Sequence, residues 1–223
     1  EGCRRTGVGH LVYASSSSVY GLNATPFRAS DRTDHPVSLY GATKKANEVM
    51  THAYAHLFGV PATGLRFFTV YGPWGRPDMA TMKFTRAILA GDPIDVYGHG
   101  EMKRDFTYVG DIADSVVALL DRAPEADPAW TPEAGDPAAS SAPHRVFNIG
   151  NGEPVLLTEF IRTLEELLGR KANLVLREMQ PGDLVETSSD TEPLARLLGA
   201  APHTPLAEGL ARFVAWYREF YRV

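Results

Sequence analysis

The sequence predicts an α/β protein built on a Rossmann-type parallel sheet, and three neighbouring segments carry this prediction. An apolar strand at residues 10–14 runs into the serines at 15–18. A helix is predicted over residues 39–58, and a second buried strand at 62–68 ends in a polar loop. A strand, a helix and a strand, with polar residues at the carboxyl end of each strand, is the arrangement with which an open parallel sheet builds a site.

Composition limits the classes of protein that fit. A chain of 223 residues, 44% hydrophobic and 22% charged, has room for one sizeable α/β domain or for one domain plus a small lobe. The net charge of −5 gives no basic patch, so nucleic acid is not an expected partner. The single cysteine, Cys3, excludes an internal disulfide and fits a reducing compartment, which we expect to be the cytoplasm. No apolar run approaches the ~20 residues that span a bilayer.

The helix over 39–58 begins after Pro36 and Ser38 and meets no breaker before Gly59. Tyr40 and Lys44 are four residues apart, so they lie on the same helix face. A phenol is a poor base at neutral pH, but a cation about 4 Å away favours the phenolate by ~4 kcal/mol at an effective dielectric constant of ~20. The pair can therefore form a base that takes a hydroxyl proton. The alternative is a packed aromatic ring beside a solvated lysine.

Apolar spacing predicts which side of this helix is buried, with Ala46, Val49, Met50, Ala53 and Leu57 on that face. His52 and His56 have a spacing seen in zinc sites, but no third ligand motif accompanies them, so no metal is expected.

The rest of the chain continues the alternation of strands and helices. The expected elements begin with a rigid loop at 71–78, a helix at 79–90 that stops at Gly91, and strands at 94–97 and 103–109. A helix at 112–121 capped by Asp111, a Pro/Ala-rich surface insertion at 122–144 and a strand at 145–149 follow. The last elements are a helix that is capped by Thr158, runs to Leu168 and stops at Gly169, a strand at 174–176, and an amphipathic helix that opens at Thr204-Pro205 and shares Leu206, Leu210, Phe213, Val214 and Tyr217 on one face.

Four blocks in a fixed order carry a resemblance to a known family. They are the stretch from His35 to Asn47, the stretch from Gly64 to Asp78, the segment Lys103-Arg-Asp-Phe-Thr-Tyr108, and the turn Gln180-Pro-Gly-Asp183. The chain resembles the extended short-chain dehydrogenases/reductases from about Gly9 to its end. Within that family it is most similar to the NAD-dependent nucleotide-sugar epimerases, and above all to UDP-glucuronate 4-epimerases. The resemblance implies NAD as cofactor, a UDP-sugar as substrate and a homodimer formed through the Tyr40 helix.

The resemblance also divides the chain. Residues 1–92 correspond to the C-terminal half of the NAD-binding Rossmann domain, with return segments from 104–150, and residues 93–223 correspond mainly to a small α+β sugar-nucleotide lobe, with the insertion at 122–144. The glycine-rich turn that seats the pyrophosphate does not follow a strand here. At ~30 residues per βαβ unit, on the order of a hundred residues are expected to precede this sequence. The chain alone is then expected to have an unpaired sheet edge and no activity.

The resemblance assigns the catalytic roles. Ser16, Tyr40 and Lys44 form the expected catalytic set, and Tyr40, Lys44, Phe67 and Val70 are expected to contact NAD. Ser15 and Ser17 are expected to bond the local backbone. In related decarboxylases and dehydratases a glutamate stands at the position of Ser18, and serine there favours simple epimerisation.

Substrate contacts are expected from both halves of the chain. A sugar carboxylate needs a guanidinium fork and hydroxyl donors, which Arg76, Thr69 and Ser18 can supply. The alternative for Arg76 is a loop arginine bonded to carbonyl groups.

The resemblance places three further side chains on the nucleotide. Tyr97 would lie near the uracil, Arg104 at the diphosphate, and Asp183 at the ribose hydroxyls. The alternative for Arg104 is an ion pair with Asp105 or Glu101. Many UDP-glucose epimerases carry an arginine where Gln180 stands, which weakens the argument for UDP-glucose.

The expected reaction is the NAD-dependent interconversion of UDP-glucuronate and UDP-galacturonate by transient oxidation at C4. Three alternatives stay open: a UDP-glucose 4-epimerase, a UDP-glucuronate decarboxylase, and an inactive or non-catalytic protein with a dinucleotide fold.

Overall fold

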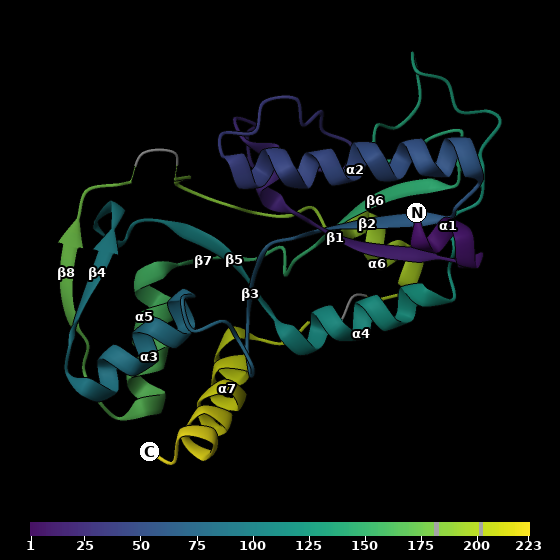
Figure 1. The fold of residues 1–223 in the computed structure, drawn as a ribbon. Helices are drawn as coiled ribbons and strands as arrows, with labels where there is room; N and C mark the ends of the chain where they lie inside the picture. Colours follow the sequence, from purple (N-terminus) through teal and green to yellow (C-terminus); the bar gives the residue numbers. More distant parts are fainter. Residues whose placement is uncertain (181–182, 201–202) are drawn as a thin grey trace.

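The computed structural model describes residues 1–180, 183–200 and 203–223 (Figure 1). The elements follow in the order α1 (Gly2–Thr6), β1 (Leu11–Ser16), η1 (Ser17–Tyr20), α2 (Leu39–Phe58), β2 (Ala62–Phe67), β3 (Thr69–Tyr71), α3 (Ala80–Ala90), β4 (Pro93–Tyr97), η2 (Gly98–Gly100), β5 (Lys103–Tyr108), α4 (Val109–Leu120), β6 (His144–Ile149), β7 (Pro154–Leu156), α5 (Leu157–Leu168), β8 (Asn173–Arg177), α6 (Glu192–Leu198) and α7 (Leu206–Tyr221), where η marks a 3-10 helix.

A parallel sheet in the order β1-β2-β6 forms the middle of one layered part. Leu11 lies opposite Ala62, and Ala62 lies opposite His144. Helix α2 runs across one face of this sheet, and α4 lies on the other (Figure 1). The central strand β2 is buried along nearly its whole length, as expected for a strand with both faces covered. In the described part of the chain β1 pairs with β2 alone and is an edge strand. The predicted α/β class with a parallel sheet is confirmed.

The second part surrounds two smaller sheets, β3-β5-β7 and β4-β8. Strand β5 pairs in parallel with β3 and antiparallel with β7, and β4 pairs in parallel with β8. Helices α3, α5 and α7 enclose its core (Figure 1). Of the five residues predicted on the inner face of α7, Leu210, Phe213, Val214 and Tyr217 are buried, and Leu206 is half-buried and packs against the same core.

Glycine ends the helices where the sequence predicts it. Gly59, Gly91 and Gly169 follow α2, α3 and α5 with φ angles of 64°, 78° and 68°, in the left-handed region that terminates helices without a side-chain penalty. No helix in the described ranges has both the length and the apolar character to cross a membrane.

The predicted buried face of α2 is wrong. Ala46, Val49, Met50, Ala53 and Leu57 are all exposed, and the helix instead buries Gly41, Glu48 and Ala55. Apolar spacing failed because this helix packs on the rest of the protein through two small residues and an ion-paired carboxylate. The larger apolar side chains that were predicted to be buried are exposed.

The two predicted side-chain caps are also wrong. Asp111 lies in the first turn of α4, and its carboxylate accepts hydrogen bonds from the Thr204 amide and hydroxyl at 2.8 Å each. Helix α5 begins one residue before Thr158 and has no side-chain cap. Asp111 therefore ties α4 to the segment that enters α7, a long-range bond that local sequence does not reveal.

The insertion at 122–144 docks onto the start of β6. The Val146 amide donates to the Ala138 carbonyl at 2.7 Å, and the Ser140 hydroxyl is bonded to His52 of α2 at 2.8 Å.

Candidate active site

Tyr40 and Lys44 lie together on the first two turns of α2, as their spacing predicts. The Lys44 Nζ atom is 5.8 Å from the centre of the Tyr40 ring and donates a hydrogen bond of 3.2 Å to the Ala14 carbonyl oxygen. Ala14 belongs to β1, so this bond joins the lysine to the strand that ends in the serines. The Tyr40 side chain is exposed. The pair is thus held beside β1 with its phenol open to a ligand.

A glycine sets how closely α2 approaches the serines. Ser38 caps α2 by accepting a hydrogen bond of 3.0 Å from the Gly41 amide. A Cβ atom on Gly41 would lie 2.5 Å from the Ser18 carbonyl oxygen, a distance that real Cβ atoms do not reach. Only glycine therefore lets the first turn of α2 lie directly on η1, which brings Tyr40 next to the serine run.

Ser16 is the last residue of β1 and is nearly buried. Its Oγ atom accepts a hydrogen bond of 3.2 Å from the Ser18 amide. Within the described residues its own hydroxyl donates to no protein group, so that proton is free for a ligand oxygen.

An internal polar network that was not predicted lies behind these residues. Arg66 of β2 donates from Nε and Nη2 to the two carboxylate oxygens of Glu48, at 2.9 and 3.0 Å. Ser15 donates to the same carboxylate at 2.6 Å, so the expectation that Ser15 bonds the local backbone is wrong. The network fixes α2 and β1 to β2. The signal was an arginine inside an otherwise apolar strand, which needs a buried partner.

Phe67 and Val70, the expected cofactor contacts, are half-buried at the end of β2 and in β3. Both pack against the apolar cluster around Leu65, Ile112 and Ile149.

A groove runs from the serines into the second part of the molecule. One cavity of about 210 Å³ is lined by Ser18 and Ser38, and a larger one of about 590 Å³ is lined by Tyr97, Phe84 and Asp95. Three residues line both cavities: Thr69, Arg104 and Asp183. Five of the predicted substrate residues therefore border two cavities that meet, namely Ser18, Thr69, Tyr97, Arg104 and Asp183.

Arg104 pairs with Asp183 across this junction. Its Nη2 atom donates to the Asp183 Oδ1 atom at 2.6 Å, and Nη1 donates to the Lys103 carbonyl oxygen at 2.9 Å. The predicted alternative partners were Asp105 and Glu101, and neither is bonded to Arg104. Pro181 and Gly182 of the predicted Gln180–Asp183 motif lie outside the described residues.

Asp105 is fully buried and faces other segments of the chain. Its carboxylate accepts hydrogen bonds from the backbone amides of Asn151, Gly152 and Ser189 at 2.7, 3.1 and 3.0 Å. It therefore holds the segment after β6 against β5, and Arg104 pairs with Asp183 instead.

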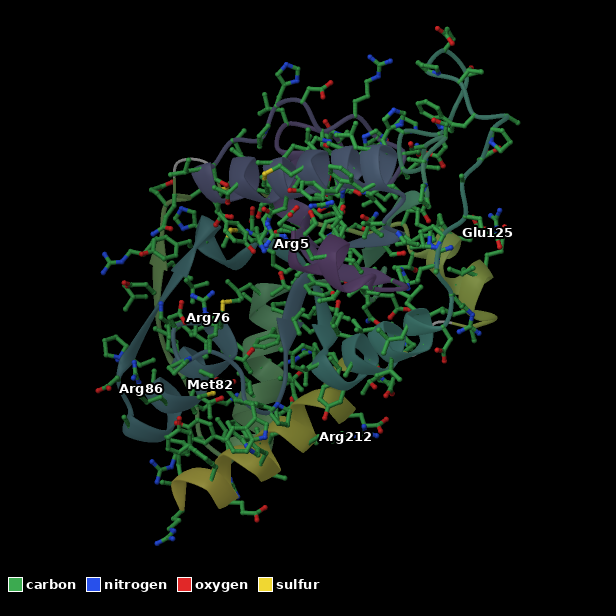
Figure 2. The ribbon with its side chains drawn as sticks, turned by 45° about the vertical axis from the view of Figure 1, so that its right-hand side comes forward. Arg5, Arg76, Met82, Arg86, Glu125 and Arg212 are labelled. Carbon is green, nitrogen blue, oxygen red and sulfur yellow. The ribbon has the colours of Figure 1, made fainter. Side chains whose placement is uncertain are left out.

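Arg76 is exposed in the loop between β3 and α3 and forms a bidentate ion pair with Asp78, at 3.1 Å from Nε and 2.6 Å from Nη2. Its partner is a carboxylate, where the alternative interpretation expected carbonyl groups. Asp78 lines the larger cavity. Figure 2 shows Arg76 on the same side of the molecule as Met82 and Arg86 of α3.

The residues present fit the reactive end of a nicotinamide cofactor. Of the three donors on the Lys44 ammonium group, one is used by Ala14, so two are free for ribose hydroxyls. Ser16 ends β1, the strand whose Ala14 carbonyl binds Lys44, so the lysine and the serine lie close to the same strand end.

Comparison with known proteins gives the family. Residues 1–150 match the model of the NAD dependent epimerase/dehydratase family. The chain is 59% identical over its whole length to an uncharacterized 37.6 kDa protein of Escherichia coli O111:H-, of which it covers 67%. Over 96% of the chain it is 50% identical to a probable UDP-glucuronate 4-epimerase of Rhizobium meliloti (strain 1021), of which it covers 63%.

Comparison with solved structures points to the same family. A crystal structure of UDP-glucuronic acid 4-epimerase from Bacillus cereus, in complex with UDP-glucuronic acid and NAD, superposes with a TM-score of 0.81 at 30% identity, over 98% of this chain and 64% of that one. The chain thus spans about two thirds of the length of these relatives. The family match, the identities and the shared fold agree that this chain belongs to the NAD-dependent epimerase/dehydratase family.

Proposed function

We propose that this chain carries the catalytic residues and the sugar-nucleotide site of an NAD-dependent UDP-sugar 4-epimerase that interconverts UDP-glucuronate and UDP-galacturonate. One observation carries the proposal: Lys44, beside Tyr40, is bonded to β1 close to its serine end, and Ser18 of the same serine run lines a cavity together with Arg104. A base close to the serine run and a phosphate-binding arginine on the cavity that Ser18 lines suit a sugar attached to a diphosphate. The relatives named as UDP-glucuronate 4-epimerases support the choice of substrate.

In the mechanism, Tyr40 takes the proton of the sugar C4 hydroxyl. Ser16 donates its free hydroxyl to the same oxygen and holds it in place. Lys44 stabilises the phenolate and binds the nicotinamide ribose. A bound NAD would supply the acceptor for the hydride of C4 and the donor that returns it. Tyr40 gives its proton back to the C4 oxygen after the sugar has turned and presents its other face.

The carboxylate at C6 sets a second requirement. A 4-keto uronate is a β-keto acid and can lose carbon dioxide, so the site must hold the carboxylate firmly through the oxidised stage. We assign this role to Arg76 with Thr69 and Ser18. Arg76 would exchange its present partner, Asp78, for the substrate carboxylate, a bidentate pair of the same chemistry.

The nucleotide contacts follow the second cavity. We assign Arg104 to the diphosphate, Asp183 to the ribose and Tyr97 to the uracil. Residues 1–92 would then belong to the NAD-binding part and residues 93–223 mainly to the sugar-nucleotide part. Phe67 and Val70 would line the NAD side.

A homodimer through α2 is also proposed. The exposed apolar side chains of this helix support it, because Val49, Met50 and Leu57 are more than half exposed on one element. A second copy of the chain would cover them. We place the protein in the cytoplasm on the evidence of its single cysteine.

Incubation with UDP-glucuronate tests the proposal, and it uses the NAD-loaded full-length protein, which includes the residues expected to precede Glu1. Formation of UDP-galacturonate is the expected result, and UDP-xylose as the main product would assign a decarboxylase instead. Arg76→Ala should lower turnover of UDP-glucuronate far more than turnover of UDP-glucose. Equal losses on both sugars would favour the UDP-glucose 4-epimerase, and a purified protein that binds no NAD would favour a non-catalytic role.

A further inference from the structure

The loop at residues 72–79, here called the Arg76 loop, joins β3 to α3 and carries both Arg76 and Asp78. Its backbone is not relaxed. Trp74 has a φ angle of 63°, in the left-handed region that side chains other than glycine disfavour. Conformations of this kind persist where surrounding contacts hold them.

The contacts that hold Trp74 come from the far end of the chain. Its ring lies 5.4 Å from the ring of Trp216 and 5.1 Å from that of Phe220, in tilted and edge-to-face arrangements. Trp216 and Phe220 stack on each other at 5.3 Å with an interplanar angle of 22°. Both belong to α7. Aromatic pairs at these distances attract beyond the area they bury.

Helix α7 is itself firmly anchored. Leu210, Phe213 and Tyr217 are buried in the core of the second part. The aromatic contacts therefore connect the exposed Arg76 loop to a rigid element. Trp74 is 74% exposed, so these contacts serve the position of the loop more than the burial of the ring.

The same helix also holds the base of the loop. The Tyr71 hydroxyl, at the end of β3, donates to the Leu206 carbonyl oxygen at 3.4 Å. A Cβ atom on Gly209 would overlap that hydroxyl, so glycine is required for this approach. The first turn of α7 thus contacts the residue before the loop, and its last turns contact the tip.

We infer that Trp74, Trp216 and Phe220 are positioning residues that aim the Arg76 guanidinium at the substrate, so that α7 contributes to the selectivity for a uronate. The inference rests on the role proposed above for Arg76. A bidentate arginine-carboxylate pair demands a defined orientation of the fork, which a loop free to move would not maintain. Helix α7 lies at the opposite end of the molecule from α2, which carries Tyr40 (Figure 1), so loss of the aromatic contacts should affect binding of the carboxylate and leave the chemistry at C4 intact.

Steady-state kinetics of the NAD-loaded protein test this with UDP-glucuronate and UDP-glucose. Trp74→Ala and Phe220→Ala should each raise KM for UDP-glucuronate about threefold to tenfold, with kcat and the constants for UDP-glucose unchanged. The double variant should show no more than the larger single effect, because both changes break the same contact. Trp74→Phe should restore most of the affinity.

The matched control is Trp130→Ala, which removes a tryptophan in the insertion at 122–144. Backbone amide exchange in residues 72–79 should rise in the first two variants and stay the same in the control.

The experiment distinguishes failure of the proposed function from failure of the positioning role. A wild-type protein that does not act on UDP-glucuronate overturns the proposed function, whatever the variants do. A wild-type epimerase whose KM is unmoved by Phe220→Ala overturns the positioning role alone. Equal rises in KM for both sugars, or additive effects in the double variant, would show that Trp74 acts by another route and also overturn it.

Discussion

Arg66 and Glu48 form a bidentate ion pair inside the protein, with N–O distances of 2.9 and 3.0 Å and side chains that are 3% and 4% exposed. The Arg66 Nη1 atom also donates to the Tyr20 hydroxyl at 3.0 Å and to the Ala29 carbonyl at 3.1 Å. One pair thereby connects the helix that carries Tyr40 to the central strand and to η1. It is the main polar support of the site.

Removing one partner of this pair should be strongly destabilising. Glu48→Ala leaves the Arg66 charge buried without a partner, and we expect a loss of about 3–5 kcal/mol in the free energy of unfolding. Urea denaturation measures it. The matched control is Glu192→Ala, which removes a glutamate from an exposed pair with Arg196 and should change little. Similar small effects for both variants would contradict the supporting role.

The protein should lose stability between pH 7 and pH 5 because of His144. Burial, and then the charge of His52, lower the pKa of His144 to about 4 from 6.5. The unfolded chain therefore binds a proton that the folded protein does not, so stability is complete above pH 6.5 and falls as the pH drops toward 4. The expected loss is about 2 kcal/mol by pH 5. Thermal melts of His144→Asn should show a flatter pH profile, whereas the exposed His203→Asn should retain the wild-type profile.

Glu48 should affect the stability of the protein at lower pH than His144 does. Burial opposes its ionisation, but the hydrogen bonds and the charge of Arg66 prevail and lower its pKa below 4.5. The contribution of Glu48 to stability is therefore present above pH 4.5 and is lost as the pH falls through the lowered pKa. Acid unfolding of Arg66→Met should lack this low-pH loss of stability. Its presence in that variant would assign the transition to another carboxylate.

Tyr40→Phe should lower kcat strongly with little effect on folding. The ring is more than half exposed, so removal of its hydroxyl leaves packing intact. A lost general base typically costs 10²–10⁴ in rate, and we expect a fall in kcat of about that size. NAD content after purification is the control, and it should match the wild type. Retained turnover would move the base to another residue.

Gly41→Ala tests the approach of α2 to η1. The added methyl group would press on the Ser18 carbonyl oxygen and push the first turn of α2 outward, so kcat should fall while the fold is kept. Gly2→Ala is the matched control, since a Cβ there meets no atom within 4 Å. The rate of turnover of isotopically labelled UDP-glucuronate measures the change in kcat. Unchanged kcat in Gly41→Ala would show that Tyr40 does not depend on this contact.

Arg104→Ala should affect both sugars, in contrast to Arg76→Ala. The diphosphate is common to UDP-glucuronate and UDP-glucose, so KM should rise for each by a similar factor. Hydrogen bonds to charged groups are worth about 1.5–3 kcal/mol, which corresponds to roughly tenfold to a hundredfold. Arg162→Ala, on the helix α5, is a charge-matched control. An effect confined to the uronate would assign Arg104 to the carboxylate instead.

The sequence by itself determined the elements and the local partners within them. Period and breakers predicted α2 over its full length, the inner face of α7 and the glycine stops of three helices, because these depend on residues a few positions apart. Spacing along one helix likewise placed Tyr40 and Lys44 together.

The tertiary structure decided which distant groups meet. It turned the apolar face of α2 outward, paired Arg104 with Asp183, bonded Asp111 to Thr204 and set Trp74 against α7. Each of these contacts joins residues far apart in the chain or sets a surface against another element. Such contacts depend on how whole elements pack and on which charges they bury, and no local pattern of residues records that.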